Sequence, residues 1–241
     1  DTNALRLAAR RTWLFFERFV TEEENWLPPD NFQENPKPVI AHRTSPTNIG
    51  LYLNCVLAAR DFGWIGTVET VERLEATLAT LRKLSRYRGH FFNWYETKFL
   101  DTLNPRYIST VDSGNLAGNL LVVKNTCSKI AGAISVDHRF DGLGDAINLL
   151  REAVAVPLRI AEPMRHELQD MLERLDRIVL AAHGDVVVWS QLEEHEEHAQ
   201  NLAAELSQLD SEKLFLRKAV ESIANWTKSH SKDREIYAHP E

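Results

Sequence analysis

Residues 45–63 read SPTNIGLYLNCVLAARDFG, and this stretch decides the fold class. Ser45 is a preferred residue type at a helix N-cap, and Pro46 suits the first position inside the helix. The apolar residues that follow occupy nearly every face of the helix, so it is predicted to be buried. Gly63 is placed to end it, because glycine readily adopts the left-handed conformation found after helix C-termini.

Helical patterns continue on both sides of this stretch. A first helix is predicted from about Asn3 to Val20, and a third, from about Val68 to Arg88, carries one apolar stripe, as on a surface helix. A fourth, from about Ser113 to Ile130, is apolar on several faces and is expected to be buried. Four further helices are expected near residues 142–159, 162–183, 190–208 and 211–228. The chain is therefore predicted to be all-α.

Buried and amphipathic helices alternate along the chain, which is the pattern of an α/α toroid built from antiparallel helical hairpins. The inner helices of such a toroid are surrounded by protein, and the outer helices face solvent. Helices two apart begin on the same rim, so the loop before the second helix (41–45) and the loop before the fourth (89–112) are expected to share one face. Both loops lead to positive helix N-termini, which suits a polar ligand.

Composition and charge exclude several functional classes. The net charge of −7 and the lack of a basic face argue against a nucleic-acid partner. No apolar run is long enough to span a membrane, so no membrane contact by this segment is expected. Cys55 and Cys127 fall in apolar helical patterns and are expected to be buried free thiols. No glycine motif for phosphates or nucleotides occurs, and no cofactor is predicted.

Residues 193–198 read EEHEEH and place His195 and His198 on one face of a helix. No third, distant ligand accompanies them, and the HExxH order of zinc proteases is absent. We therefore predict no metal site, and the run is interpreted as a solvated acidic face.

The segment from residue 90 to residue 115 combines aromatic, amide and acidic side chains in a predicted loop. Flat aromatic faces beside hydrogen-bonding groups suit a sugar, which has an apolar C–H face and a rim of hydroxyls. With the residues just before the second helix, this segment supplies the candidate substrate-binding residues: His42, Arg43, Asn93, Trp94, Tyr95, Glu96, Asp112 and Asn115.

Structural roles stay open for several of these candidates. The aromatic residues of the loop are equally explained if they fill the core. Asp112, just ahead of a buried helix, also suits its N-cap, and Arg43 beside a helix start also suits a brace for its loop. Glu96, next to Trp94, is the better candidate for a carboxylate that contacts a substrate.

Four sequence motifs in one order carry a family resemblance. They are HRTSPTNIGLYL (42–53), AARDFGWIG (58–66), HFFNWYET (90–97) and STVDSGNLAG (109–118). Together they resemble cyclic β-1,2-glucan synthase, with weaker similarity back through LPPDNFQENPKP (27–38). From about residue 125 onward, the chain reads as generic helices with little resemblance.

The resemblance implies an excised part of a very large bacterial inner-membrane enzyme. Such synthases combine a nucleotide-sugar glycosyltransferase, a glucoamylase-like α/α toroid and a phosphorylase-like domain. The matching region is the start of the glucoamylase-like part, which is associated with cyclising the glucan by transglycosylation. Residues 1–241 would then be a single helical domain or partial toroid, with a motif-bearing part (1–125) and a generic helical part (126–241). The implied location is the cytoplasmic face of the membrane.

The resemblance also implies a role as one wall of the glucan-binding cleft. The implied partners are the β-1,2-glucan chain and the remaining domains of the parent synthase, a glycosyltransferase and transglycosylase. A complete toroid of twelve helices needs on the order of 300 residues, so the essential carboxyls are expected downstream of residue 241. No catalytic residue is assigned, and this chain alone is expected to be inactive. Two alternatives stay open: a helical scaffold that docks to neighbouring domains, and an independent α/α glycosidase acting on β-1,2-glucans.

Overall fold

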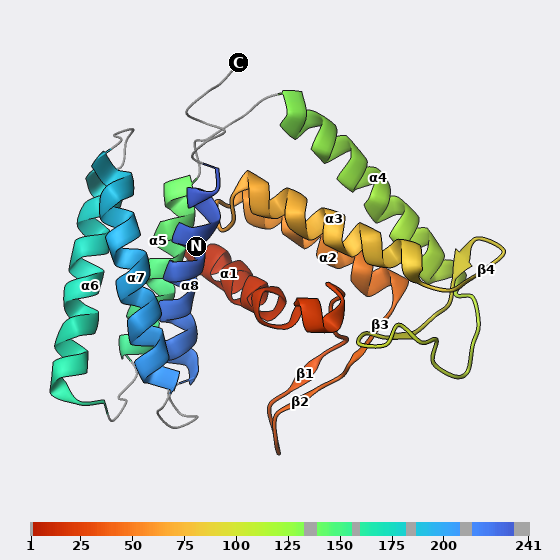
Figure 1. The fold of residues 1–241 in the computed structure, drawn as a ribbon, viewed down its shortest axis with the longest axis horizontal. Helices are drawn as coiled ribbons and strands as arrows, with labels where there is room; N and C mark the ends of the chain where they lie inside the picture. The colour runs from red at the N-terminus through yellow and green to blue at the C-terminus, as the bar shows by residue number, and fades with distance from the viewer. Residues whose placement is uncertain (1, 133–138, 156–159, 182–186, 208–213, 234–241) are drawn as a thin grey trace. The chain divides into compact units, whose positions relative to one another are not determined.

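The computed structural model describes residues 2–132, 139–155, 160–181, 187–207 and 214–233. These ranges contain eight α-helices (Figure 1): α1 (Thr2–Phe19), α2 (Pro46–Asp61), α3 (Thr67–Lys83), α4 (Thr110–Gly132), α5 (Arg139–Ala155), α6 (Glu162–Ala181), α7 (Val187–Ser207) and α8 (Leu214–Ser231). The predicted all-α class is confirmed.

Three antiparallel pairs of two-residue strands tie the connecting loops together. The pairs are β1 (Phe32–Gln33) with β2 (Val39–Ile40), β3 (Arg43–Thr44) with β6 (Tyr95–Glu96), and β4 (Arg86–Tyr87) with β5 (His90–Phe91). A 3₁₀ turn (Glu22–Glu24) follows α1. Ladders this short do not change the fold class, but they hold the loops in place.

The two ends of α2 follow the predicted signals. Ser45 Oγ accepts a hydrogen bond from Asn48 N at 3.2 Å, as an N-cap does. Gly63 follows the helix with a φ of 75°, which favours glycine. By contrast, α3 ends at Lys83, earlier than predicted, because the chain turns into the β4–β5 hairpin at Gly89.

The chain packs as two compact units. One combines Asp1–Arg11, Arg60–Glu69 and Val136–Glu241, and the other combines Thr12–Ala59 and Thr70–Ser135. Helices α1, α2 and α3 each contribute to both. We call the second the motif unit, because it holds the two loops of the candidate site, and the first the bundle unit.

The motif unit is built around α2. The core side chains Ile49, Tyr52 and Leu53 have no exposed surface. The neighbouring helix α3 buries one stripe, which includes Leu74 and Leu81, and leaves its remaining faces more exposed. The predicted contrast between a buried second helix and a more exposed third helix is confirmed.

The prediction that the fourth helix is buried is wrong. Of the 23 residues of α4, only Leu116 and Val123 are buried, whereas Val111, Leu121 and Val122 are 69%, 62% and 50% exposed. Cys127 on the same helix is exposed too, so its predicted burial is wrong. The helix is apolar on several faces, as the sequence indicates, but burial also requires partners that cover those faces. Within the described part of the chain, α4 extends away from α2 and α3 toward its C-terminal end (Figure 1).

Helices α2 and α4 run parallel and touch along their first turns. Thr47 on α2 donates to Asp112 Oδ1 at 2.5 Å and accepts from Asn115 Nδ2 at 3.1 Å, both on α4. Further along both helices, a Cβ added to Gly50 would come within 2.7 Å of the Asn119 side chain. Because the contacting residue numbers rise together, both helices begin on the same rim, as the toroid reasoning predicts.

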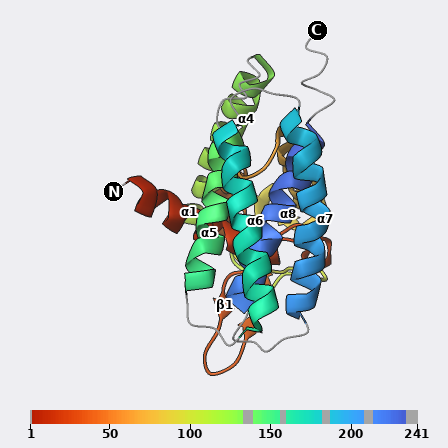
Figure 2. The same cartoon turned by 90° about the vertical axis from the view of Figure 1, so that its left-hand side faces the viewer.

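In the bundle unit, four helices form a closed ring of neighbours (Figure 2). Helix α5 packs against α6 and α8, and α7 packs against the same two helices. Their buried residues recur at helical spacing and include Leu143, Leu150, Leu168, Leu202 and Leu216. This is the arrangement of a four-helix bundle.

A polar cluster joins the start of α1 and the turn after α2 to this bundle. Asp145 on α5 accepts hydrogen bonds from Arg6 Nη2 and Trp64 Nε1, each at 2.7 Å. Beside it, Gly142 packs directly on Gly63, where an added Cβ would lie 1.8 Å from the carbonyl oxygen. Residue 142 must therefore be glycine unless the backbone moves.

Burial lowers the pKa of His230 on α8 from 6.5 to about 4. The side chain is 1% exposed, and its Nδ1 lies 2.9 Å from Trp226 O. Its Nε2 has no hydrogen-bond partner among the described residues, so a proton there would be a buried donor without an acceptor. Asp233 and Glu69 raise this pKa and Arg139 lowers it further, but burial dominates. Protonation of His230 therefore opposes folding.

We predict that this histidine makes the protein less stable in acid. Its folded pKa lies below the unfolded value of 6.5, so its stability contribution is fully present above pH 6.5 and is lost as pH falls toward 4. As pH falls from about 7 to about 5, His230 should lower the free energy of unfolding by about 2 kcal/mol. Urea denaturation at each pH measures this change. His230→Gln should reduce this pH dependence, whereas His198→Gln, exposed on α7, should not. Equal pH dependence of wild type and His230→Gln would contradict the prediction.

Candidate functional site

The pairing of β3 with β6 brings the two predicted loops together. Arg43 stands opposite Glu96, and Thr44 stands opposite Tyr95. The loop before α2 and the loop before α4 therefore share one face, as predicted. Both loops lead to the N-terminal ends of the parallel helices α2 and α4.

His42 is held by a buried acid that the sequence did not reveal. Its Nδ1 lies 2.8 Å from Glu24 Oε1, and Glu24 is only 6% exposed. The Thr97 hydroxyl donates to the other oxygen of this carboxylate, and Thr97 N donates to His42 O at 3.1 Å. Glu24 thereby links the turn after α1 to both loops of the site. No local signal marks it, because it is the last of three successive glutamates.

Arg43 lies between an acid and an aromatic ring. Its Nε and Nη2 lie 3.2 Å and 2.9 Å from Asp30 Oδ2, and its guanidinium carbon lies 5.0 Å from the centroid of the Trp94 ring. Asp30 Oδ1 also accepts a hydrogen bond from Asn48 Nδ2 at 3.3 Å. Arg43 thus braces its loop and covers one face of Trp94. Asp30 was not predicted, although its place directly after two prolines marks a turn.

Asn93 and Tyr95 are buried and already bonded within the protein. The Tyr95 hydroxyl donates to Ser85 O and accepts from Phe92 N, both at 2.7 Å, and burial raises the pKa of this phenol. Asn93, which is 3% exposed, bonds to the backbone of Tyr107. Neither side chain has surface free to meet a ligand in this structure. We therefore assign Asn93 and Tyr95 a structural role in place of the predicted contact with a sugar.

Glu96 shapes a turn with its carboxylate. One of its oxygens accepts hydrogen bonds from Lys98 N at 2.9 Å and from Phe99 N at 2.5 Å. Asn25 Nδ2 ties down the same turn by donating to the carbonyls of Thr97 and Lys98, each at 2.8 Å. The half-buried Glu96 side chain therefore supports the loop at the edge of the candidate site.

The N-cap of α4 is Ser109, and the alternative that placed Asp112 at the cap is wrong. Ser109 Oγ accepts a hydrogen bond from Asp112 N at 3.1 Å, which puts Asp112 at the third helical position. Its carboxylate instead accepts from Thr47 on α2, and the exposed Asn115 donates to the same hydroxyl. Asp112 and Asn115 thus lie together at the rim that α2 and α4 share.

The carboxylates described above are each bonded to protein groups. Retaining glycosyl transfer needs two carboxyl groups about 5 Å apart, one as nucleophile and one as acid/base. On the face described here, the half-buried ring of Trp94 has the Arg43 guanidinium over it. We therefore assign no catalytic residue among these carboxylates.

The acidic run at residues 193–198 lies within α7. His198 Nε2 lies 3.4 Å from Glu167 Oε1, and both line a cavity of about 450 Å³ with His195. The side chains of Glu193 and Glu194 lie outside the described residues. Within the described residues, no group of three or more side chains is suited to hold a metal ion.

Among the helices of the described residues, none is both long and apolar enough to cross a membrane.

Comparison with curated proteins finds the cyclic β-(1,2)-glucan synthase NdvB of Rhizobium meliloti (strain 1021), which is 57% identical to this chain over 152 residues. This chain resembles a segment of a cyclic β-1,2-glucan synthase. The resemblance drawn from the motifs is therefore confirmed. The match covers 62% of this chain and 5% of the length of the synthase NdvB. Because 152 residues exceed the motif-bearing part (1–125), the similarity extends past residue 125, where little resemblance was expected. No protein-family profile matches the chain.

We predict that removing the Glu24 carboxylate destabilises the loops of the candidate site. Glu24→Ala leaves the His42 ring and the Thr97 hydroxyl without their shared partner, and such a loss costs about 1–3 kcal/mol. Urea denaturation followed by tryptophan fluorescence measures the change. The control is Glu23→Ala, one residue away and exposed, which should stay within about 0.5 kcal/mol of wild type. Equal stabilities of the two variants would show that the buried cluster is dispensable.

Proposed function

We propose that this chain is part of a cyclic β-1,2-glucan synthase and contributes one wall of the glucan-binding cleft of its transglycosylating domain, which cyclises the glucan. The observation that carries the proposal is the β3–β6 pair, which joins the two motif-bearing loops at the ends of α2 and α4. The similarity to the synthase NdvB supports the same assignment.

Six side chains of this face are proposed to meet the glucan. Trp94 is half-buried, with Arg43 over one face, and its remaining exposed part is available to the apolar face of a sugar. The helix N-termini add positive potential for hydroxyl oxygens. The proposed contacts are His42, Arg43, Trp94, Glu96, Asp112 and Asn115.

The proposal also treats residues 1–241 as part of an incomplete toroid. Along α4, a Cβ added to Gly114 or Gly118 would meet nothing within 4 Å, and Leu121 and Val122 are exposed. Such an open apolar face is unusual for a monomeric protein. We propose that further helices of the parent synthase pack against it.

The proposed partners are the β-1,2-glucan chain and the remaining domains of the parent synthase. The proposed location is the cytoplasmic face of the bacterial inner membrane, as a domain of a membrane-anchored parent. The parent acts as a glycosyltransferase and transglycosylase. This chain alone is proposed to be inactive, with the catalytic carboxyls supplied by another part of the parent.

A helical scaffold is the second candidate, and the open face of α4 favours it. In that case α4 docks to a neighbouring domain, and the loops around Trp94 serve the same docking rather than a sugar. Binding of oligosaccharide separates the two candidates, because a scaffold has no reason to recognise glucose units.

We predict that the chain binds linear β-1,2-gluco-oligosaccharides weakly and neither cleaves nor cyclises them. Trp94→Ala should weaken binding by about tenfold, because it removes a stacking surface. Isothermal titration calorimetry measures the affinity, and chromatography of the sugars tests for products. Phe215→Ala, an exposed aromatic of the bundle unit, is the control and should bind as wild type does. Lack of binding would favour the scaffold, and product release would favour an independent glycosidase.

We predict that the open face of α4 makes the isolated chain self-associate. Leu121→Asp should shift the chain toward monomer in light scattering, because a charge opposes burial of that face. Leu5→Asp, on α1 and 71% exposed, is the matched control and should leave the association unchanged. A clean monomer for the unsubstituted chain would argue against the incomplete toroid and for a self-contained domain.

A further inference from the structure

The loop before α4 presents an exposed aromatic ring on a backbone that is held firmly in place. We propose that Tyr107 and Arg106 form a sugar subsite, in which the tyrosine ring stacks on the apolar face of one glucose unit and the guanidinium donates to its hydroxyls. This inference rests on the proposed function and adds two residues to that site.

A buried asparagine holds the backbone of Tyr107. Asn93 N donates to Tyr107 O at 3.0 Å, and Tyr107 N donates to Asn93 Oδ1 at 3.4 Å. Four residues earlier, Leu103 N donates to Trp94 O at 3.0 Å, which ties the same segment to the residue just before β6. A ring presented on a fixed backbone loses little conformational entropy when a ligand binds.

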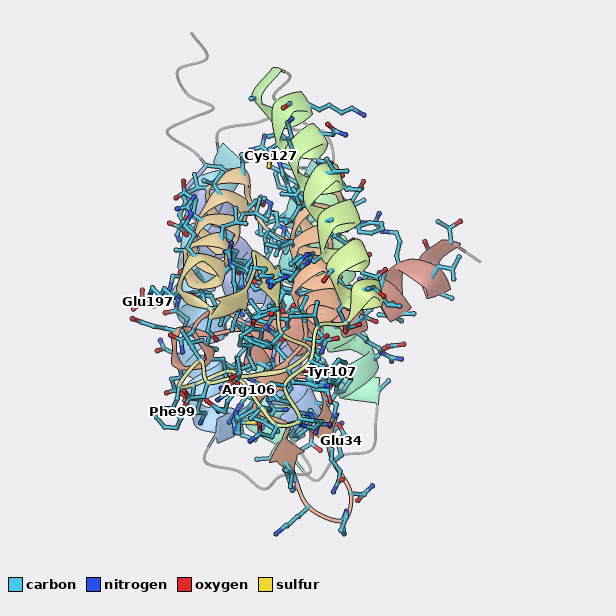
Figure 3. All side chains as sticks on the ribbon, turned by 90° about the vertical axis from the view of Figure 1, so that its right-hand side faces the viewer. Glu34, Phe99, Arg106, Tyr107, Cys127 and Glu197 are labelled. Carbon is cyan, nitrogen blue, oxygen red and sulfur yellow. The ribbon has the colours of Figure 1, made fainter. Side chains whose placement is uncertain are left out.

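The two side chains are free to meet a ligand. Tyr107 is 51% exposed, and Arg106 is exposed beside it. Among the described residues, neither the tyrosine ring nor the guanidinium has a hydrogen bond, ion pair or ring contact. Figure 3 shows both on the loop that runs below the N-terminal end of α4. By comparison, Trp94 already carries Arg43 over one face.

The chemistry of the loop selects a neutral sugar over other ligands. Residues 96–112 carry three acids (Glu96, Asp101 and Asp112) against two bases (Lys98 and Arg106), so the segment has no excess positive charge to attract an anionic ligand. A purely apolar partner would leave the guanidinium and the phenol hydroxyl unpaired. A pyranose suits both side chains, because its C–H face covers the Tyr107 ring and its hydroxyl oxygens accept hydrogen bonds from the Arg106 guanidinium.

The subsite adjoins the rim already described. Tyr107 precedes the cap residue Ser109 by two positions, and Asp112 and Asn115 lie on the first turns of the helix that follows. A glucan bound along this rim would therefore place one unit on Tyr107 and present its hydroxyls to the side chains of α4.

The test is isothermal titration calorimetry, in which linear β-1,2-gluco-oligosaccharides are added to the 241-residue chain or to one of its variants. Tyr107→Ala should weaken the affinity by about tenfold, and Tyr107→Phe should keep it within about twofold, because the ring is retained. Arg106→Gln should weaken it by about three- to tenfold. The matched control is Tyr87→Ala, which removes a tyrosine of similar exposure (54%) from the β4–β5 hairpin and should change nothing.

The outcomes separate this inference from the proposed function. Wild-type affinity in both Tyr107→Ala and Arg106→Gln, with weakened binding in Trp94→Ala, would overturn the subsite and leave the proposed function standing. No saturable binding by the unsubstituted chain would overturn both. Far-UV circular dichroism checks that Tyr107→Ala folds, and Arg106→Gln remains decisive if it does not, because the Arg106 side chain supports no described contact.

Discussion

The antiparallel pairing of two residues in β3 with two residues in β6 holds the candidate site together. Thr44 and Tyr95, one facing pair of this ladder, have no exposed surface. A slip of one residue in register would turn Tyr95 out of the core and bring its neighbour in, which makes the register strongly specified. The other facing pair, Arg43 and Glu96, is turned toward the site by the same constraint. The register thus determines which polar groups meet at the ends of α2 and α4.

The parts of the fold and site that follow from local chemistry could be predicted. Ser45 caps α2 because its hydroxyl satisfies an otherwise unpaired backbone amide, and Gly63 follows that helix because it tolerates positive φ. The meeting of the two loops follows from topology, since one helix between two others returns the chain to the same rim. The order of the helices along the chain predicted that these two loops share a face, but not that the Arg43 guanidinium lies over the Trp94 ring.

The inner partners of the site could not be predicted, because they depend on contacts between distant residues. In the sequence, Glu24 is one of three successive glutamates that would be expected to face solvent. In the structure it is buried and contacts His42, which belongs to a different loop. Tyr95 and Tyr107 are aromatic residues of one loop, but Tyr95 lies in the β3–β6 ladder and is buried, whereas Tyr107 lies outside the ladder and is exposed. The exposure of α4 has a related cause: an apolar pattern shows that a helix can be buried, but it does not say what covers it.

Helix α4 connects the polar rim to the open apolar face. Its first turns are tied to α2 through Thr47, but toward its C-terminal end Leu121 and Val122 remain exposed. In the proposed cleft, groups that position a substrate must be held to within fractions of an ångström, and a helix whose other faces are uncovered by the described residues is poorly suited to this. Further helices packed on that face would immobilise α4 and, with it, Asp112 and Asn115 at its N-terminal end. Completing the hydrophobic contacts of α4 would therefore also complete the geometry of the site.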